Sequence, residues 1–263
     1  MKYVLITGAS SGIGLAMCHK FASEGHNLII VARSEDKLNT LKSELESQFH
    51  IDVMVKVVDL STFGAAQQLY DQCAEYEIEV LVNNAGFGDF SNAWDMSLDK
   101  AEQMLDLNIK ALTTLSLNYV RDYRDKDATL INVSSIGGYK MFPTAVTYCA
   151  TKFYVSAFTE GVAEDLRIGQ KPMRAKVLAP AATATDFFNQ AYTNAGLESD
   201  ASTDRSQYTP ASVLATYTYQ LFQSEHIVGH IDGDGQLILQ PPIFDYVLAK
   251  VKLTGQAENA LGF

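Results

Sequence analysis

The sequence of 263 residues has only three cysteines. Cys18, Cys73 and Cys149 form neither the even-numbered framework of a disulfide-rich protein nor the close spacing of metal ligands. Long apolar runs are also lacking, because none approaches the roughly 20 residues that a transmembrane helix requires. The first three residues lead directly into an apolar segment, so we expect no secretory signal. These absences predict free thiols in a cytoplasmic protein and argue against a membrane protein.

Positive charge is scarce as well: 20 lysines and arginines face 31 aspartates and glutamates, which gives a net charge of −11. Nucleic acids and anionic membrane surfaces repel such a chain, so neither is expected as a partner. An anionic cofactor would need local positive groups, and each well-placed lysine or arginine is therefore informative. Hydrophobic residues make up 47% of the chain, which is enough for a packed core.

Apolar segments alternate with segments of helical periodicity along almost the whole chain. Strands are expected at 4–6, 27–32, 53–58, 80–82, 128–133 and 175–179, with a final strand between 227 and 239. Helices are expected at 15–21, 38–45, 62–74, 98–121, 148–166 and 210–222. These repeated β-α units predict an α/β fold, a doubly wound parallel sheet of the Rossmann type with helices on both faces. Because no linker divides the chain, we expect residues 1–263 to form a single domain.

A glycine-rich turn joins the first strand to the first helix. Its sequence is Thr7-Gly8-Ala9-Ser10-Ser11-Gly12-Ile13-Gly14. Glycines allow a sharp turn and a close approach to a ligand, and the following helix N-terminus presents unpaired N–H groups to a phosphate. The hydroxyls of Ser10 and Ser11 either cap this helix or contact the phosphate. The turn therefore predicts a nucleotide-binding site; the alternative is a turn that only connects the strand to the helix and binds no ligand.

The end of the second strand bears on the choice of cofactor. Arg33 lies there, about 20 residues beyond the glycine turn, where dinucleotide folds contact the adenosine ribose. No carboxylate precedes Arg33, and a guanidinium matches the geometry of a 2′-phosphate, so we expect NADP(H), with NAD(H) as the alternative. Lys37 lies one helical turn further on and can assist. A solvated arginine, partly neutralised by the acidic residues that follow it, is the other interpretation.

The ends of the third and fourth strands extend the predicted cofactor site. Asp59 can accept a hydrogen bond from the adenine amino group, with Leu60 beside it; a helix cap is the alternative role of Asp59. The fourth strand closes with Asn83-Asn84-Ala85-Gly86. Two amides and a glycine suit a close approach to the cofactor and can hold neighbouring strand ends together. A simple turn is the alternative.

Ser135 ends the fifth strand, and Tyr148 and Lys152 open the next helix. Positions i and i+4 share a helix face, so both side chains are expected to point into the site. A free phenol has a pKa of about 10, and a nearby ammonium and the positive nicotinamide ring are both expected to lower it for acid–base catalysis. In this interpretation Lys152 binds the nicotinamide ribose and Ser135 binds the substrate carbonyl. Taken alone, the Tyr-x-x-x-Lys pattern is often just helix surface.

In this order and spacing, these motifs resemble the short-chain dehydrogenase/reductase family over nearly the whole chain. The resemblance implies an NAD(P)-dependent oxidoreductase that interconverts alcohols and carbonyls, with Tyr148 as the acid or base. It implies a catalytic asparagine at Asn108, which would bind a water that relays protons to Lys152. Arg33 fits the NADP-preferring branch of the family.

After the sixth strand, the family usually has Pro-Gly and then a threonine that binds the nicotinamide carboxamide. This chain has Pro180-Ala181-Ala182-Thr183-Ala184-Thr185, with alanine in place of the glycine. The resemblance still places Pro180, Thr183 and Thr185 at the cofactor, because Thr185 keeps its expected position.

The segment 186–209 is expected to be a mobile substrate lid by the same resemblance. Aromatic and apolar side chains there and in neighbouring loops are candidates for the substrate pocket: Phe87, Tyr139, Met141, Phe142, Phe187, Phe188 and Tyr192. Together they predict a small-molecule ketone or aldehyde that is moderately apolar or aromatic. Ordinary core packing or subunit contact is the alternative for each.

A metal site is not expected, because the stretch with His226, His230, Asp232 and Asp234 lacks a calcium-loop pattern. The helices at 98–121 and 148–166 carry apolar residues on more than one face, and in this family they pair across a two-fold axis. A homodimer or homotetramer is therefore expected, with the tail 236–263 as a candidate extension of the interface. Two other functions stay open: a cofactor-binding sensor without catalysis, and an epimerase or dehydratase of the extended branch.

Overall fold

The computed structural model describes residues 1–197 and 208–246. Its strands are β1 (Lys2–Thr7), β2 (Asn27–Ala32), β3 (Val53–Val57), β4 (Glu77–Asn83), β5 (Thr129–Val133), β6 (Arg174–Ala179), β7 (Thr183–Ala184), β8 (Thr209–Pro210), β9 (Val228–Ile231) and β10 (Leu237–Gln240). In the described part of the chain, eight of them form one sheet in the order β10-β9-β6-β5-β4-β1-β2-β3, and β7 pairs with β8. Within the large sheet every neighbouring pair is parallel except β9 and β10.

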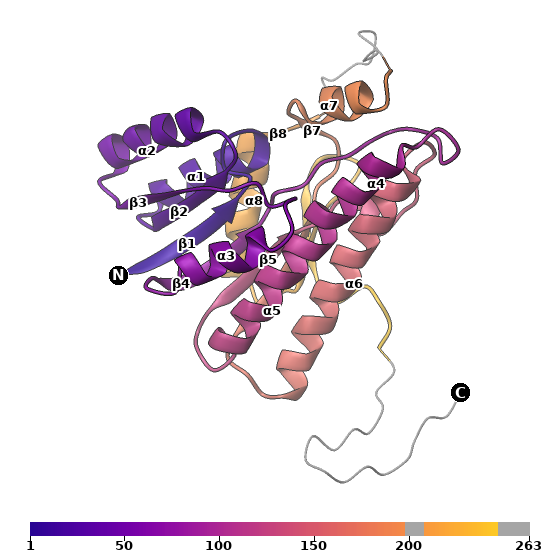
Figure 1. Cartoon of the computed structure of the whole chain (residues 1–263). Helices are drawn as coiled ribbons and strands as arrows, with labels where there is room; N and C mark the ends of the chain where they lie inside the picture. The colour runs from indigo at the N-terminus through magenta and orange to yellow at the C-terminus, as the bar shows by residue number, and fades with distance from the viewer. Residues whose placement is uncertain (198–207, 247–263) are drawn as a thin grey trace.

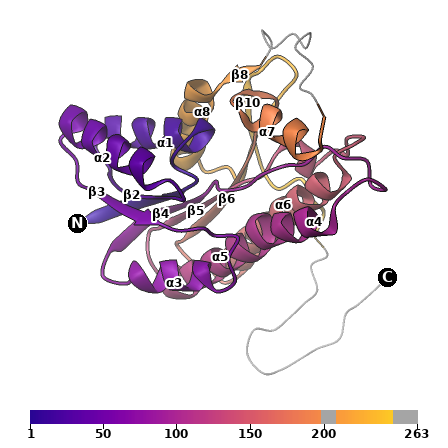
Figure 2. The ribbon, with the colours of Figure 1, turned by 45° about the horizontal axis from the view of Figure 1, so that its top comes forward.

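Helices cover both faces of this sheet (Figures 1 and 2). The helices are α1 (Gly12–Ser23), α2 (Glu35–Phe49), α3 (Ala65–Gln72), α4 (Leu98–Leu105), α5 (Leu112–Tyr123), α6 (Val146–Ile168), α7 (Phe187–Asn194) and α8 (Ala211–Gln223). The helices α1, α2 and α8 lie on one face, and α3, α5 and α6 lie on the other. The fold is the predicted Rossmann-type α/β domain. No helix in the described residues is long and apolar enough to span a membrane.

The sequence of β2 explains why the sheet is buried on both faces. Successive side chains of a strand point to opposite sides, so an unbroken apolar run needs a helix layer on each side. Leu28 and Ile30 pack into the cluster under α1 and α8, whereas Ile29 and Val31 pack into the cluster under α3 and α5. All four are fully buried. Because the strands run parallel, their carboxyl ends lie at one edge of the sheet, and the loops that follow them gather there.

The helix expected at 98–121 is interrupted. A π-helical turn, η1 (Asp106–Ala111), separates α4 from α5. The side chain of Asn108 lies in this turn, where it accepts a hydrogen bond from the Phe87 N–H at 3.1 Å and donates one to the Phe87 carbonyl at 2.9 Å. Single π turns of this kind often occur at functional sites. Helical periodicity alone cannot reveal one extra residue in a turn.

The expected final strand is two strands, β9 and β10, so this prediction was incomplete. The Asp232 carboxylate closes the turn between them by accepting hydrogen bonds from the N–H groups of Asp234 and Gln236, both at 2.9 Å. The hairpin makes β10 the antiparallel edge of the sheet. Beyond the predicted elements, α7 lies in the expected lid segment 186–209, of which 198–207 fall outside the described residues.

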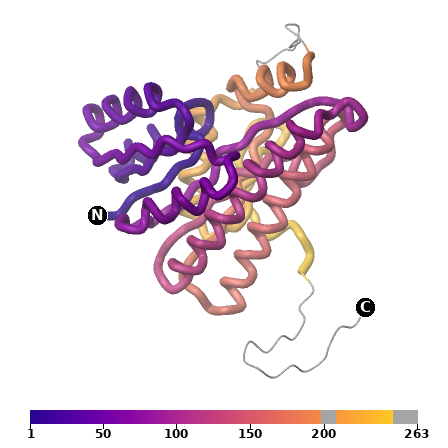
Figure 3. Tube along the Cα trace, in the orientation of Figure 1, coloured from indigo at the N-terminus to yellow at the C-terminus, as the bar shows by residue number. Residues whose placement is uncertain are grey.

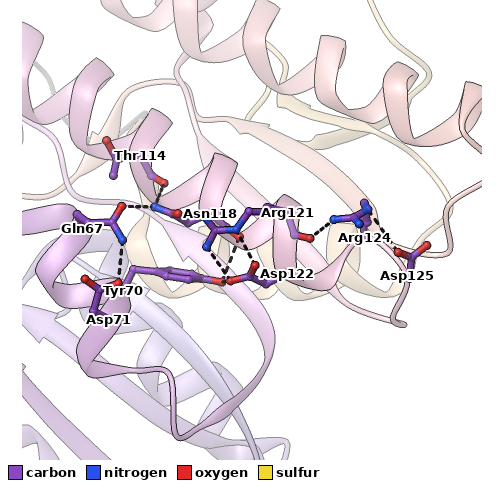
Figure 4. Close-up of polar contacts among 9 residues, drawn as sticks. All are labelled: Gln67, Tyr70, Asp71, Thr114, Asn118, Arg121, Asp122, Arg124 and Asp125. Carbon is purple, nitrogen blue, oxygen red and sulfur yellow. Dashed lines mark hydrogen bonds and ion pairs between the residues drawn. The ribbon is translucent and has the colours of Figure 1, made fainter. Parts of the chain in front are cut away.

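Polar contacts fasten α3 to α5 (Figure 4). The Tyr70 hydroxyl donates to Asp122 at 3.0 Å and lies 3.2 Å from the Asn118 carbonyl, and Asn118 donates to Gln67 at 2.7 Å. Arg121 forms two hydrogen bonds with the same Asp122 carboxylate. Burial, together with Asp122, raises the pKa of Tyr70 far above its ordinary value, so the phenol stays a donor. This network holds α3 against α5, and its residues lie away from the cleft.

Candidate active site

A cleft of about 2080 Å³ follows the edge where the parallel strands end. Most residues predicted for the site line it: Gly8, Ser10, Ser11, Gly12, Ile13, Arg33, Lys37, Asp59, Leu60, Ala85, Gly86, Ser135, Tyr148, Lys152, Pro180, Thr183 and Thr185. Three predicted residues, Gly14, Asn83 and Asn108, lie behind this described lining. Loops that are far apart in sequence therefore share one continuous cavity, as expected for an open α/β sheet.

The glycine turn shapes one end of the cleft, which we call the phosphate end (Gly8 to Ile13, with Arg33). Gly8 has φ +70°, and a Cβ on Gly14 would lie 2.2 Å from the Gly8 carbonyl oxygen, so neither position accepts a side chain. Ser11 stands at the N-cap of α1, and within the described residues its side chain makes no capping hydrogen bond. Its hydroxyl and the first N–H groups of α1 are thus available to an anion.

The two adjacent asparagines at the end of β4 hold strand ends together. Asn84 donates from its side chain to the Thr7 carbonyl at 2.9 Å, and its backbone N–H donates to the Thr7 hydroxyl at 3.0 Å. Asn83 is buried, and its amide donates to Ser116 at 3.0 Å and to Asn132 at 2.9 Å. Asn83 therefore lies below the cleft, whereas Ala85 and Gly86 line it.

Arg33 and Asp59 face each other at the phosphate end of the cleft. Their side chains are 3.9 Å apart, and the Arg33 side chain is 78% exposed. Asp59 also accepts hydrogen bonds from the backbone and hydroxyl of Ser61 at 3.0 and 2.6 Å. Burial raises the pKa of Asp59, but the Ser61 hydrogen bonds and Arg33 outweigh it and hold the pKa below its ordinary value. Asp59 closes this turn without capping α3, whose N-cap is Gly64.

Ser135, Tyr148 and Lys152 meet in the middle of the cleft. Burial raises the pKa of Tyr148 to about 12, and a hydrogen bond with Ser135 opposes this shift. The Lys152 Nζ donates to the Val133 carbonyl at 2.9 Å and lies 5.8 Å from the centre of the Tyr148 ring. Burial lowers the pKa of Lys152 to about 8. The ammonium therefore does not produce its part of the expected fall in the pKa of Tyr148, because desolvation dominates and the ammonium is directed at a carbonyl.

Asn108 lies behind the part of the cleft lining that Tyr148 and Lys152 form. Besides its bonds to Phe87, its amide donates to Thr151 at 3.1 Å. A Cβ placed on Gly86 would lie 3.0 Å from Asn108 Oδ1 and 3.5 Å from Lys152 Nζ. The bare backbone of Gly86 thus lies against both polar groups, so the glycine keeps space beside them.

Aromatic rings form the other end of the cleft, which we call the substrate end (Phe90, Phe187, Phe188 and Tyr192). The Phe90 ring lies 5.4 Å from Tyr192, 5.6 Å from Phe188 and 6.3 Å from Tyr148. Phe187 lies 5.5 Å from Tyr148. The trace of α7 lies above the segment that leads into α4 (Figure 3), and the Phe90 N–H bonds to the Ala191 carbonyl at 3.4 Å.

The prediction for the substrate end needs three corrections. Tyr139 lies outside the described lining, because its hydroxyl donates to Glu160 at 2.6 Å and its ring stacks on Phe244. Met141 is exposed and likewise lies outside that lining. Phe90 was missed, and no motif marks it, although it lies only four residues beyond Gly86. Phe87 and Phe142 do line the cleft.

His230, Asp232 and Asp234 belong to the β9–β10 hairpin, and His226 precedes β9. A ring nitrogen of His230 lies 3.2 Å from the Gln240 side-chain amide, and the Asp232 carboxylate accepts a hydrogen bond from the Asp234 N–H in the turn. Among residues 1–197 and 208–246, no three His, Cys, Asp or Glu side chains gather in a way that could hold a metal ion. The three cysteines are buried and free.

Comparisons with known proteins agree with this geometry. The family model for short chain dehydrogenases matches residues 2–196. An uncharacterized oxidoreductase of Staphylococcus saprophyticus is 33% identical over 191 residues, covering 71% of this chain and 76% of that protein. The 7beta-hydroxysteroid dehydrogenase of Collinsella aerofaciens is 31% identical over 163 residues, 62% of each protein.

Among solved structures, a short-chain dehydrogenase from Sphingobium yanoikuyae in complex with NADPH has a TM-score of 0.77 and 26% identity. The match covers 88% of this chain and 87% of that one. With the family model spanning most of the chain and the site residues gathered in one cleft, the protein belongs to the short-chain dehydrogenase family and is an oxidoreductase with the nucleotide-binding fold of that family.

Proposed function

We propose that this oxidoreductase interconverts a ketone or aldehyde and the corresponding alcohol, with NADP(H) as the hydride carrier. The observation that carries the proposal is the meeting of Ser135, Tyr148 and Lys152 in the cleft, where one carbonyl oxygen can reach both hydroxyls. When bound, the nicotinamide supplies or accepts the hydride at the carbonyl carbon.

The chain's own residues handle the proton and the oxygen. In reduction, Tyr148 donates its proton to the carbonyl oxygen; its burial, which raises the pKa to about 12, keeps the phenol protonated at neutral pH. Ser135 donates a hydrogen bond to the same oxygen and stabilises its developing charge. Lys152 binds the nicotinamide ribose. Asn108 orders a water that relays protons to Lys152, since both side chains border Gly86.

The phosphate end fits a dinucleotide. The backbone from Ser10 to Ile13 and the Ser11 hydroxyl would hold the pyrophosphate, because the first turn of α1 carries no acidic residue in the described structure. Leu60 and Asp59 would contact the adenine, and Ala85 and Gly86 the ribose next to it. Pro180, Thr183 and Thr185, which line the far wall, would hold the nicotinamide carboxamide.

Preference for NADP(H) rests on Arg33. Its guanidinium is exposed at the cleft wall with Lys37 beside it, and the residue before it, Ala32, offers no carboxylate to a 2′-hydroxyl. The relative from Sphingobium yanoikuyae was solved with NADPH. Because the chain is acidic overall, two positive side chains, Arg33 and Lys37, at this end of the cleft favour NADP(H), which carries an additional phosphate.

The substrate end favours a moderately apolar or aromatic small molecule, because aromatic rings surround the space next to Tyr148. In this proposal the segment 186–209, bracketed by β7 and β8, is the lid. We also propose a cytoplasmic location, since three buried free thiols suit a reducing compartment. A homodimer or homotetramer is a further part of the proposal.

The test is turnover of NADPH with a panel of ketones and aldehydes, followed by the loss of absorbance of the reduced nicotinamide. Tyr148→Phe removes only the hydroxyl and is expected to lower kcat by about a thousandfold. The dissociation constant for NADPH should stay within about twofold, which separates loss of chemistry from loss of binding. Wild-type rates in Tyr148→Phe would remove the tyrosine from the mechanism.

A further inference from the structure

The helix face that carries Tyr148 and Lys152 continues to Ser156 and Glu160, each four residues further along α6. Glu160 is completely buried, at 0% exposure. No lysine or arginine pairs with it among residues 1–197 and 208–246. A buried carboxylate without a cation is costly unless hydrogen bonds satisfy it, so its donors reveal what it holds.

Three donors converge on the Glu160 carboxylate from two separate segments. The Tyr139 hydroxyl donates to Oε1 at 2.6 Å. The backbone N–H groups of Ile243 and Phe244 donate to Oε2 at 2.6 and 3.0 Å. The rings of Tyr139 and Phe244 stack with their centres 5.5 Å apart, so the two segments also touch each other directly. We call residues 241–246 the C-terminal strap.

Tyr139 belongs to the loop that carries Ser135. Between them lies a 3-10 turn, η2 (Ile136–Gly138), whose Gly137 N–H donates to the Ser135 hydroxyl oxygen at 3.0 Å. The turn presses against α6, because a Cβ on Gly138 would lie 2.5 Å from the Ser156 hydroxyl. The loop thus rests on α6 at Gly138, and its far end is fixed by Tyr139.

From these contacts we infer that Glu160 is a positioning residue that ties the C-terminal strap to the Ser135 loop. One carboxylate accepts hydrogen bonds from both segments, so the orientation of the Ser135 hydroxyl depends on whether the strap is docked. The inference rests on the proposed function in one respect, namely that Ser135 binds the substrate oxygen. It adds Glu160 and the C-terminal strap, which both lie outside the cleft, to the groups that position Ser135.

The chemistry requires a carboxylate at this position. Both oxygens of the Glu160 carboxylate accept hydrogen bonds here. In Glu160→Gln one oxygen becomes an NH₂ group, which must face either the Tyr139 hydroxyl or the two N–H groups of the strap. Facing the strap, the NH₂ group meets two donors and those bonds are lost; facing Tyr139, it forces the hydroxyl to accept where it donated before. Either way one segment is held differently while the volume of the side chain is unchanged.

The experiment compares Glu160→Gln with Glu164→Gln, a control one helical turn further along α6. Glu164 bonds to Arg167 on its own helix, and among residues 1–197 and 208–246 no hydrogen bond joins it to the Ser135 loop or the strap. For Glu160→Gln, kcat for carbonyl reduction should fall about tenfold, because a small displacement of Ser135 weakens its hydrogen bond to the substrate oxygen. KM for NADPH should stay within about twofold. Glu164→Gln should match wild type.

Hydrogen exchange tests the coupling without relying on turnover. In Glu160→Gln, amides 136–139 should exchange faster than in wild type whichever bond is weakened, because the loop and the strap are held through the same side chain. Neither 136–139 nor 243–244 should change in Glu164→Gln. Faster exchange at the strap alone, with kcat unchanged, would overturn the coupling. If no carbonyl is turned over by the wild type, the proposed function fails, and the exchange data still decide whether Glu160 joins the segments.

Tyr139→Phe is a second variant in case Glu160→Gln does not fold. It leaves Glu160 its two backbone donors and removes only the bond to the loop. We expect a loss in kcat of about threefold and faster exchange at 136–139, with 243–244 close to wild type. Unchanged kcat and exchange in this variant would remove Tyr139 from the coupling and overturn the inference.

Discussion

The two ends of the cleft are built in different ways. Apart from the Arg33 side chain, the phosphate end is made of backbone from one short stretch, Gly8 to Ile13, and its shape depends on glycine positions where a Cβ does not fit. The substrate end is made of side chains from segments about 100 residues apart, with Phe90 against Phe188 and Tyr192. One end is thus specified locally by the chain and the other only by the assembled fold.

This contrast predicts how each end responds to change. A turn whose backbone atoms approach a ligand tolerates no added side chain, so substitutions there should abolish binding. A wall of aromatic rings can repack, since neighbouring rings and the lid can shift to fill a gap. The phosphate end should therefore show large, all-or-none effects, and the substrate end small and graded ones.

The largest effect is expected for Gly14→Ala. Its Cβ would lie 2.2 Å from the Gly8 carbonyl oxygen and 2.5 Å from the Asn84 amide, so the turn must deform. The dissociation constant for NADPH should rise at least a hundredfold, and Tm should fall by several degrees. Gly64→Ala is the control: φ is +78°, but no described atom lies within 4 Å of its Cβ. It should cost about 1 kcal/mol of stability and leave NADPH binding unchanged.

Arg33→Ala tests the phosphate end more selectively. Loss of a guanidinium–phosphate contact is expected to raise KM for NADPH by about 10- to 100-fold. KM for NADH should change less than about twofold, because NADH has no 2′-phosphate. Arg33→Lys, which keeps the charge but not the fork of donors, should fall between these values. Equal losses with both cofactors would contradict the assignment.

The same contrast explains how far the sequence could be interpreted. The strand at 27–32 was predicted to the residue, because an unbroken apolar run flanked by polar residues specifies a buried strand locally. The π turn at Asn108 and the hairpin after Asp232 were missed, because each depends on a hydrogen bond made by one side chain. Tyr139 was misplaced for a related reason, since its partner Glu160 lies 21 residues further along the chain.

Lys152 lies where the two ends meet, and its burial makes stability depend on pH. Its pKa is about 8 in the folded protein against an ordinary 10.5, so between these values the unfolded chain binds more protons. The contribution of Lys152 to the free energy of unfolding should therefore rise with pH across this window, by on the order of 2 kcal/mol between pH 8 and 10. Cys18 and Cys73, whose pKa values are raised by burial, contribute in the opposite direction. Above pH 10, the raised pKa of Tyr148 contributes in the opposite direction, because the folded state keeps the phenol proton that the unfolded chain loses.

Urea denaturation of wild type and Lys152→Met at pH 7 to 10 checks this prediction. The variant has no titrating ammonium, so the difference between the two proteins should shift in favour of wild type as pH rises above 8. In carbonyl reduction by wild type, activity should decline above the same pH as Lys152 loses its proton. A difference in stability that stays flat with pH would place the pKa of Lys152 near its ordinary value.

The smallest effect is expected at the substrate end. Phe188→Ala opens the wall formed with Phe90 and Tyr208. KM for a bulky aromatic ketone should rise about three- to tenfold, because apolar contact area is lost and the neighbouring rings repack only partly. KM for NADPH and kcat for a small aldehyde should match wild type. Phe63→Ala is the control, since Phe63 is 101% exposed and lies before α3. A hundredfold loss in Phe188→Ala would mean that the substrate end is as rigid as the phosphate end, and the contrast between the two would fail.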